Sequence, residues 1–176
     1  MLQPYYDPEA VRPMEEELER VGVQPLRTAA GVDEALARPG VTLVIINSIC
    51  GCAAGNARPG AMLALQHRVI PDHLFTVFAG MDHEAVARVR AHMSHLPPSS
   101  PCIALFREGR PVFVLERRHI EQMTAQHIAD ALRRAFDELC SAPGPSIPRE
   151  QFEQIVPVSI CGSSIPPFST PGEDPM

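Results

Sequence analysis

The chain has 176 residues, of which 45% are apolar, and a formal net charge of −6. This length and composition fit one domain with a full core and an appendage, so folding does not require disulfides. The acidic balance provides no basic surface for nucleic acid and no polybasic patch for a membrane. All fifteen basic residues are arginine, which excludes lysine chemistry such as Schiff-base formation.

The N-terminus and the cysteine content indicate a reducing compartment. Residues 1–9 show no positive region followed by an apolar stretch, and no segment has the roughly eighteen apolar residues of a membrane span. We therefore expect a cytoplasmic protein, in which cysteines seldom act as structural staples. Because the cysteines number five, they cannot all pair with one another.

The N-terminal part of the chain alternates helical and strand patterns. An Asp-Pro start and apolar residues three and four positions apart predict an amphipathic helix over residues 7–20. A weak strand at 23–28, interrupted by Pro25, should lie at a sheet edge, and a short helix is expected over 31–38. The almost uniformly apolar, β-branched run 41–47 is typical of a central strand covered on both faces.

The following part continues this alternation and ends in a hairpin and a helix. We expect helices at residues 53–66, 82–93 and 124–139. We expect strands at residues 74–79, 102–106 and 111–116. Asp82 is the expected cap of the second of these helices. The first three strands of the chain should be parallel, whereas the link 107–110 is too short for a crossover and makes the last two antiparallel. The fold class is therefore α/β, a mixed sheet with helices on both faces.

The composition changes near residue 140. Residues 141–176 hold eight of the nineteen prolines and little periodicity. We expect a domain over 1–140 and a proline-rich tail over 141–176, mostly extended, with one turn of helix around Glu150. The apolar residues 155–158 are expected to lie on the domain.

Cys50 and Cys52 form a Cys-Gly-Cys motif just after the predicted central strand. Active sites of open α/β sheets gather at that end of the strands. The N-terminus of the next helix offers partial positive charge and free N–H groups to a thiolate, and Arg58 is the nearest cation in sequence. A disulfide across one glycine should be strained and easily reduced, which favours catalysis over a structural role. We assign Cys50 as the nucleophile and Cys52 as the resolving thiol.

Pro101 is the second feature of interest. It ends the loop 97–101, follows a serine and precedes the hairpin, which makes the Ser100–Pro101 bond a candidate cis peptide. Cys102 comes directly after it.

These motifs also carry a family resemblance. It covers roughly residues 8–140 and is strongest in four segments: 44–60, 97–101, 115–121 and 135–140. The first of these contains the run Cys-Gly-Cys-Ala-Ala-Gly-Asn-Ala-Arg-Pro. These segments closely resemble the bacilliredoxin family. The resemblance implies a thioredoxin-like fold, in which a cis-proline packs against the active-site cysteines. It also implies removal of the low-molecular-weight thiol bacillithiol from mixed disulfides on proteins, and disulfide isomerase activity is attributed to the family as well.

The resemblance implies partners and supporting residues for the exchange. The partners are thiolated or disulfide-bonded proteins and a small thiol as co-substrate, with a redox-active disulfide and no bound cofactor. The supporting residues are expected to be Ser48, Gly51, Asn56, Arg58, Ser100 and Pro101. Arg58 could equally cap the helix or be solvated.

Two further cysteines leave alternatives open. Cys102 stands where a small polar residue is expected, and it is either a buried strand cysteine or a third thiol. Cys161 lies in a Ser-Ile-Cys-Gly sequence that repeats residues 48–51, in a tail that extends past the usual end of the family. It is either idle or a third redox partner, whereas Cys140 is expected only to pack or be exposed at a helix end.

Other functions remain open at this point. One is a protein disulfide isomerase or reductase that uses the same thiols, and another is a non-catalytic metal-binding or redox-sensing module. Because His67 and His73 with the two cysteines match no common zinc spacing, no metal site is predicted. His119 either borders the active-site face or is solvated, and we expect it to be solvated. Glu116, on the last strand, is either a buried proton carrier or an exposed, salt-bridged carboxylate, and we expect the latter.

Overall fold

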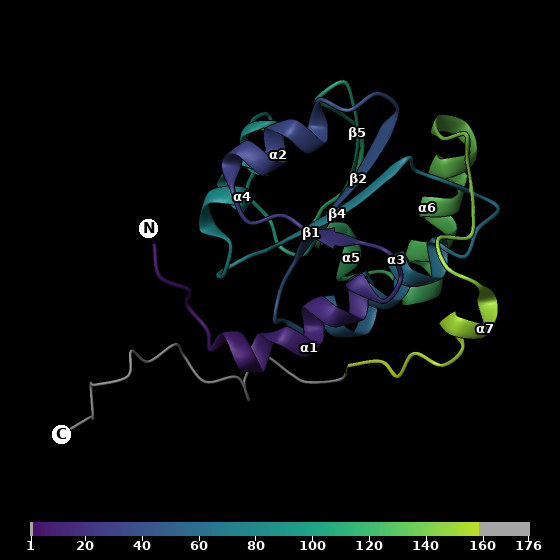
Figure 1. The fold of residues 1–176 in the computed structure, drawn as a ribbon, viewed down its shortest axis with the longest axis horizontal. Coiled ribbons are helices and arrows are strands. Elements are labelled where there is room, and N and C mark those ends of the chain that lie inside the picture. Colours follow the sequence, from purple (N-terminus) through teal and green to yellow (C-terminus); the bar gives the residue numbers. More distant parts are fainter. Residues whose placement is uncertain (1, 159–176) are drawn as a thin grey trace.

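The computed structural model describes residues 2–158 of the chain. Its centre is a five-stranded sheet in the order β1-β4-β2-β5-β6 (Figure 1). These strands are β1 (Gln24–Pro25), β4 (His73–Phe78), β2 (Val41–Asn47), β5 (Cys102–Arg107) and β6 (Arg110–Leu115). β1 and β2 both run parallel to β4, whereas β5 is antiparallel to β2 and β6. The predicted mixed sheet, with its three parallel strands and a final hairpin, is confirmed.

Helices cover both faces of this sheet. They are α1 (Pro8–Glu19), α2 (Ala29–Leu36), α3 (Arg58–Ala64), α4 (His83–Ala91), α5 (Arg117–Ile120), α6 (Ala125–Leu139) and α7 (Arg149–Phe152). One face packs against α2 and α4, and the other packs against α1, α3 and α6 (Figure 1). The two layers form the two larger apolar cores, and a third, smaller cluster lies between α1 and the end of β4.

β2 contributes side chains to both cores. All seven of its residues are buried. Leu43 and Ile45 belong to the core with α3 and α6, whereas Val44 and Ile46 belong to the core with α2 and α4. Side chains alternate across a strand, so a strand covered on both faces needs apolar residues at every position. The expected central position of this run is confirmed.

One predicted cap is wrong. Asp82 occupies the N-cap position of α4, but its side chain caps none of that helix's N–H groups. Its carboxylate instead accepts a hydrogen bond from the Phe78 N–H and pairs with Arg27 across the chain. Tertiary contacts have therefore taken the oxygen atoms that the sequence pattern assigns to the helix.

The tail continues along the domain. β7 (Ala142–Pro143) pairs with β3 (Val69–Ile70) in a small antiparallel sheet that the proline content gave no reason to expect. The predicted turn of helix is α7. Of the apolar residues 155–158, Ile155 packs against the α6 core, but Val156 is 74% exposed. The division at residue 140 stays a prediction.

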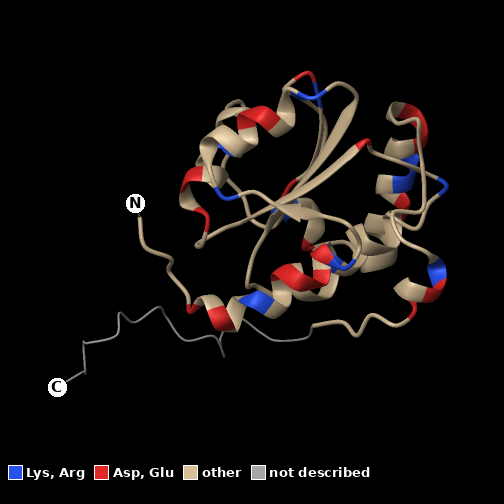
Figure 2. Cartoon of the chain, viewed as in Figure 1, with Lys and Arg blue, Asp and Glu red and all other residues tan. Residues whose placement is uncertain are grey.

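Acidic and basic residues are interspersed along the helices, as Figure 2 shows. No helix within residues 2–158 has the length and apolar character needed to cross a membrane.

Candidate functional site

The two thiols lie where β2 turns into a helix. β2 ends at Asn47, and Gly51 and Cys52 already have helical backbone. A π-helical turn, η1 (Ala53–Ala57), follows and leads directly into α3. The N–H groups of Ala53 and Ala54 bond to the Cys50 carbonyl oxygen. Cys50 therefore lies at the N-terminal end of this helix, where free N–H groups and the helix dipole favour a thiolate.

Two local hydrogen bonds fix the loop that carries Cys50. The Cys50 N–H donates to Ser48 Oγ over 3.2 Å, and the Ser48 N–H donates to Asn47 Oδ1 over 2.8 Å. Ser48 therefore supports the backbone of the nucleophile assigned from sequence. Gly51 is exposed, and a Cβ atom there would meet nothing within 4 Å. With free thiols, packing does not require a glycine at this position.

Arg58 is a buried cation beneath the loop, not the capping or solvated residue considered from sequence. Its Nε lies 3.2 Å from Glu17 Oε1, and both side chains are essentially inaccessible to solvent. Its Nη1 donates to Asn47 Oδ1 and to the Ser48 carbonyl. Burial lowers the pKa of Arg58, while the charges of Glu17 and Cys50 oppose that shift. Arg58 therefore holds the loop in place and directs its positive charge at Cys50.

Arg117 is a second cation at the site, and the sequence reasoning missed it. Its guanidinium donates to Glu121 and, through Nη1, to the Ser100 carbonyl over 3.4 Å. Glu121 is the main cause of a raised pKa of Arg117, and the charges of Cys50 and Cys52 add to that shift. The sequence pattern around Arg117 does not predict the short helix α5. The one signal for Arg117 is that it lies in the segment 115–121, which resembles the family.

Asn56 and the proline loop bring this second cation to the thiols. Asn56 Nδ2 donates to the Ile120 carbonyl over 3.0 Å and so ties α5 to the helix of the cysteines. The Ser100–Pro101 peptide, a candidate from the sequence, is cis. The Arg117 N–H donates to Ser99 Oγ, which joins α5 to the proline loop. The cysteine loop, the proline loop and α5 are thus fastened together.

Cys52 differs from Cys50 in its surroundings. It is half-buried and packs against the apolar core beneath α3 and α6. Burial is the largest cause of a raised pKa of the Cys52 thiol, followed by the negative charge of Cys50. Because a raised pKa keeps a thiol protonated near neutral pH, Cys52 is a poor nucleophile while Cys50 carries a negative charge.

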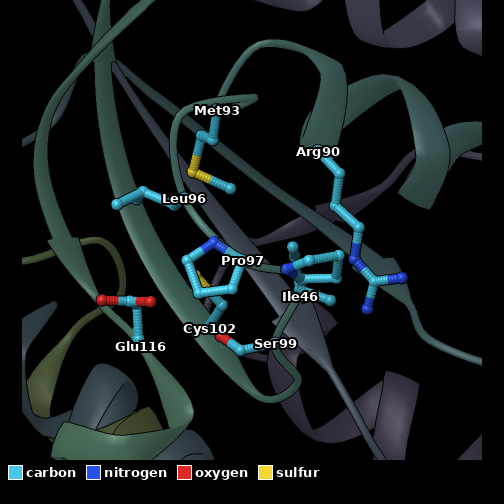
Figure 3. Close-up of a pocket in the computed structure, with 9 residues that line it drawn as sticks. Ile46, Arg90, Met93, Leu96, Pro97, Ser99, Cys102 and Glu116 are labelled. Atoms are coloured by element: carbon cyan, nitrogen blue, oxygen red, sulfur yellow. The ribbon is translucent and has the colours of Figure 1, made fainter.

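Cys102 lies behind the proline loop. It is 3% exposed and lines a small cavity of ≈ 10 Å³ with Met93, Leu96 and Glu116 (Figure 3). Burial and the nearby Glu116 raise the pKa of Cys102 to about 12. This is the environment of a buried strand cysteine.

The structure corrects two expectations nearby. Glu116 is 4% exposed, not solvent-exposed, although it does pair with Arg118 at 2.9 Å. β6 ends before it, and Glu116 instead begins α5. His119 is half-buried, and its Nδ1 accepts a hydrogen bond from the Glu116 N–H. Both side chains therefore cap α5, the helix that carries Arg117.

The remaining cysteines and histidines are dispersed. Cys140 is half-buried at the end of α6, and burial raises its pKa to about 12. Cys161 lies outside the described residues, so its role stays a prediction. His67 contacts Asp137, and His73 contacts the Pro39 carbonyl. Residues 2–158 contain no group of three or more His, Cys, Asp and Glu side chains that could hold a metal ion.

Comparison with known proteins places the chain in a family. A family model described as disulphide isomerase matches residues 6–140. A bacilliredoxin of Cytophaga hutchinsonii is 46% identical over 134 residues, which cover 76% of this chain and 99% of the relative. A bacilliredoxin of Salinibacter ruber is 48% identical over 145 residues, which cover 80% of this chain and 84% of the relative. The chain belongs to the bacilliredoxin family.

Thioredoxins are among the similar solved structures. Mitochondrial thioredoxin 3 of Saccharomyces cerevisiae aligns with a TM-score of 0.47 and 13% identity, over 68% of this chain and 98% of that one. A thioredoxin variant of Halobacterium salinarum aligns with a TM-score of 0.45 and 18% identity, over 69% and 95%. The fold of this bacilliredoxin-family chain is α/β, a mixed five-stranded sheet with helices on both faces. Its activity class is that of a thiol-disulfide oxidoreductase.

Proposed function

We propose that this protein removes a low-molecular-weight thiol, bacillithiol or an equivalent, from mixed disulfides on proteins. Cys50 is the nucleophile and Cys52 the resolving thiol. The observation that carries this assignment is the asymmetry between the two sulfur atoms. Cys50 lies at a helix N-terminus, beside the charges of Arg58 and Arg117, whereas burial holds the pKa of Cys52 above its ordinary value.

The first step transfers the small thiol to the enzyme. The Cys50 thiolate attacks the sulfur of the small thiol in the mixed disulfide, the old S–S bond breaks, and the substrate protein leaves as a thiolate that takes up a proton. A new disulfide then joins Cys50 to the small thiol. Positive charge from Arg58 and Arg117 stabilises the attacking thiolate electrostatically.

The second step resets the site. Cys52 loses its proton and attacks Cys50 Sγ, which forms the Cys50–Cys52 disulfide and releases the small thiol. Once Cys50 is in a disulfide it carries no charge, so the second-largest cause of the raised Cys52 pKa disappears. The oxidised pair must then be reduced by a thiol reductant from outside the chain. We place this cycle in the cytoplasm, where such reductants are abundant.

A protein disulfide isomerase or reductase is the second candidate, because the matching family model carries the description disulphide isomerase. Both functions use the same first attack by Cys50. They differ in whether Cys52 is needed to free the substrate protein. Reduction of a protein disulfide requires two electrons and hence both thiols, whereas removal of one small thiol from a protein requires only Cys50.

The test compares Cys52→Ala with wild type on two substrates. One is a model protein that carries a single small thiol in a mixed disulfide, and the other contains an internal disulfide. We expect Cys52→Ala to free the first substrate once per enzyme molecule and to lose reduction of the second. The matched control is Cys102→Ala, which should act like wild type on both.

The opposite outcomes are equally clear. If Cys52→Ala fails to free the thiolated protein while wild type reduces the internal disulfide, the isomerase or reductase function is the correct one. If wild type acts on neither substrate, the redox-sensing alternative replaces both.

A further inference from the structure

A polar cavity adjoins the loop that carries Cys50. It has a volume of ≈ 310 Å³ and lies between that loop, the proline loop and α4. Its lining includes Ser48 and Ile49, which directly precede Cys50, and Ser100, which directly precedes the cis-proline. This volume is within the range of small-molecule sites. The cavity therefore lies beside both elements that the exchange reaction uses.

The cation of this cavity is Arg90, on α4. Among residues 2–158, its guanidinium makes no ion pair within 4.0 Å, and its Nε is buried without a hydrogen-bond partner. Figure 3 shows the Arg90 side chain extending away from Glu116, the acidic residue of the neighbouring small cavity. Glu116 is in any case paired with Arg118. Because an unpaired buried N–H group costs free energy, Arg90 is suited to receive an anion from outside the chain.

The rest of the lining complements an anion. The cavity walls include Tyr6, His83, Ser48 and Ser100 as polar groups, and no described Asp or Glu side chain lines it. His83 uses Nε2 to contact the Gln3 carbonyl and so is held in place by the N-terminal segment. A guanidinium flanked by hydroxyl groups, without a competing carboxylate, favours a carboxylate ligand.

We infer that this cavity binds the carboxylate-bearing part of the small thiol while its sulfur is joined to Cys50, with Arg90 as the specificity-determining residue. The inference rests on the proposed function, in which Cys50 takes up a small thiol. Ile49 and Cys50 are neighbours in the chain, so their Cα atoms are about 3.8 Å apart. A thiol compound on Cys50 needs to extend only past Ile49 to enter the cavity. Of the two sources of a carboxylate, the small molecule and the substrate protein, this placement favours the small molecule.

The test measures how fast Cys50 reacts with small disulfides of different charge. In the Cys52→Ser background the adduct accumulates, and intact mass follows it over time. The probes are oxidised glutathione, which carries carboxylates, 2-hydroxyethyl disulfide, which is neutral, and cystamine, which is cationic. We expect Arg90→Gln to slow the reaction with oxidised glutathione about tenfold, because a charge-assisted hydrogen bond is lost. The reaction with 2-hydroxyethyl disulfide should change less than twofold.

Two further variants keep the result interpretable. Arg90→Lys retains the charge and should keep most of the preference for oxidised glutathione. Arg134→Gln makes the same change of charge at an exposed residue of α6, on the opposite face of the sheet, and should leave all three rates unchanged. Thermal unfolding of each variant checks that the fold is intact.

Several outcomes would overturn the inference. An equal loss of rate with all three probes in Arg90→Gln would mean that Arg90 acts on the thiolate or the fold and not on the ligand. An unchanged rate with oxidised glutathione would mean that the cavity takes no carboxylate. If Arg90→Gln slows only the reaction with proteins that carry a neutral small thiol, the cavity recognises acidic residues of the substrate protein. A failure of wild type and Cys52→Ser to react with any probe would instead refute the proposed function.

Discussion

Cys50 and Cys102 lie close together in the fold but differ in exposure and in the charges around them. Cys102 begins β5 and pairs in register with Ile46 of β2, four residues before Cys50. Cys50 is half-exposed at a helix N-terminus with two arginines nearby, whereas Cys102 is sealed behind the proline loop with a pKa raised to about 12. The same end of the same sheet therefore holds one thiol suited to react and one suited to pack.

This difference shows that position in the sheet does not by itself make a cysteine reactive. Two local features separate the pair. Cys50 lies at the N-terminal end of the helix that follows β2, whereas Cys102 faces apolar side chains and the carboxylate of Glu116. Thiolate stability, and with it nucleophilicity, follows from these neighbours.

The largest expected effect is on alkylation. At pH 8, a thiol with a pKa of about 12 is ionised in about one of ten thousand molecules. We expect iodoacetamide to modify Cys50 about a thousandfold faster than Cys102. Intact mass and peptide mapping measure the two rates. In denaturant the two rates should become similar. If the alkylation rate of Cys102 in the native protein lies within tenfold of that of Cys50, the contrast between the two thiols is contradicted.

The next effect concerns the pH dependence of the resolving step. Cys52 attacks as a thiolate, and burial raises its pKa, so fewer molecules carry the thiolate at a given pH. With a small thiol already on Cys50, we expect its release to become about tenfold faster per pH unit from pH 6 and to level off only above pH 8.5, the ordinary thiol value. Stopped-flow release measurements on the preloaded protein test this, and a plateau below pH 8 would contradict it.

The smallest effect concerns Arg117. Its side chain is 46% exposed, so solvent screens its charge. We expect Arg117→Gln to slow the reaction of Cys50 with a neutral small disulfide about threefold at low salt and hardly at all at high salt. Arg110→Gln, at an exposed position on the hairpin, is the control and should change nothing. A loss larger than about tenfold would mean that Arg117 does more than supply a screened charge.

Much of the fold was predictable from the sequence because its signals are local. The unbroken apolar run of β2 indicates a strand buried on both faces, and the short Glu108-Gly109 turn requires a hairpin. The strand pair formed by β3 and β7 was not predictable, since each strand has two residues and β7 contains a proline. Asp82 shows a different limit, because its partner Arg27 is 55 residues away in the chain.

The site was predictable only in part for the same reason. The Cys-Gly-Cys motif and its place after β2 are local features, and so is a proline that follows a serine at the start of a hairpin. The burial of Arg58 was not predictable, because it depends on Glu17 from a different helix. Arg117 reaches the thiols through contacts of α5 with Asn56 and Ser99, which no sequence pattern reveals.

The most direct test of the central claim, that Cys50 attacks and Cys52 resolves, is the intact mass of three proteins after reaction with an oxidised small thiol. We predict that wild type ends two hydrogens lighter, with a Cys50–Cys52 disulfide and no adduct. Cys52→Ser should keep one adduct that maps to Cys50, and Cys50→Ser should form no adduct under the same conditions. The account is contradicted if Cys50→Ser forms the adduct as readily as wild type.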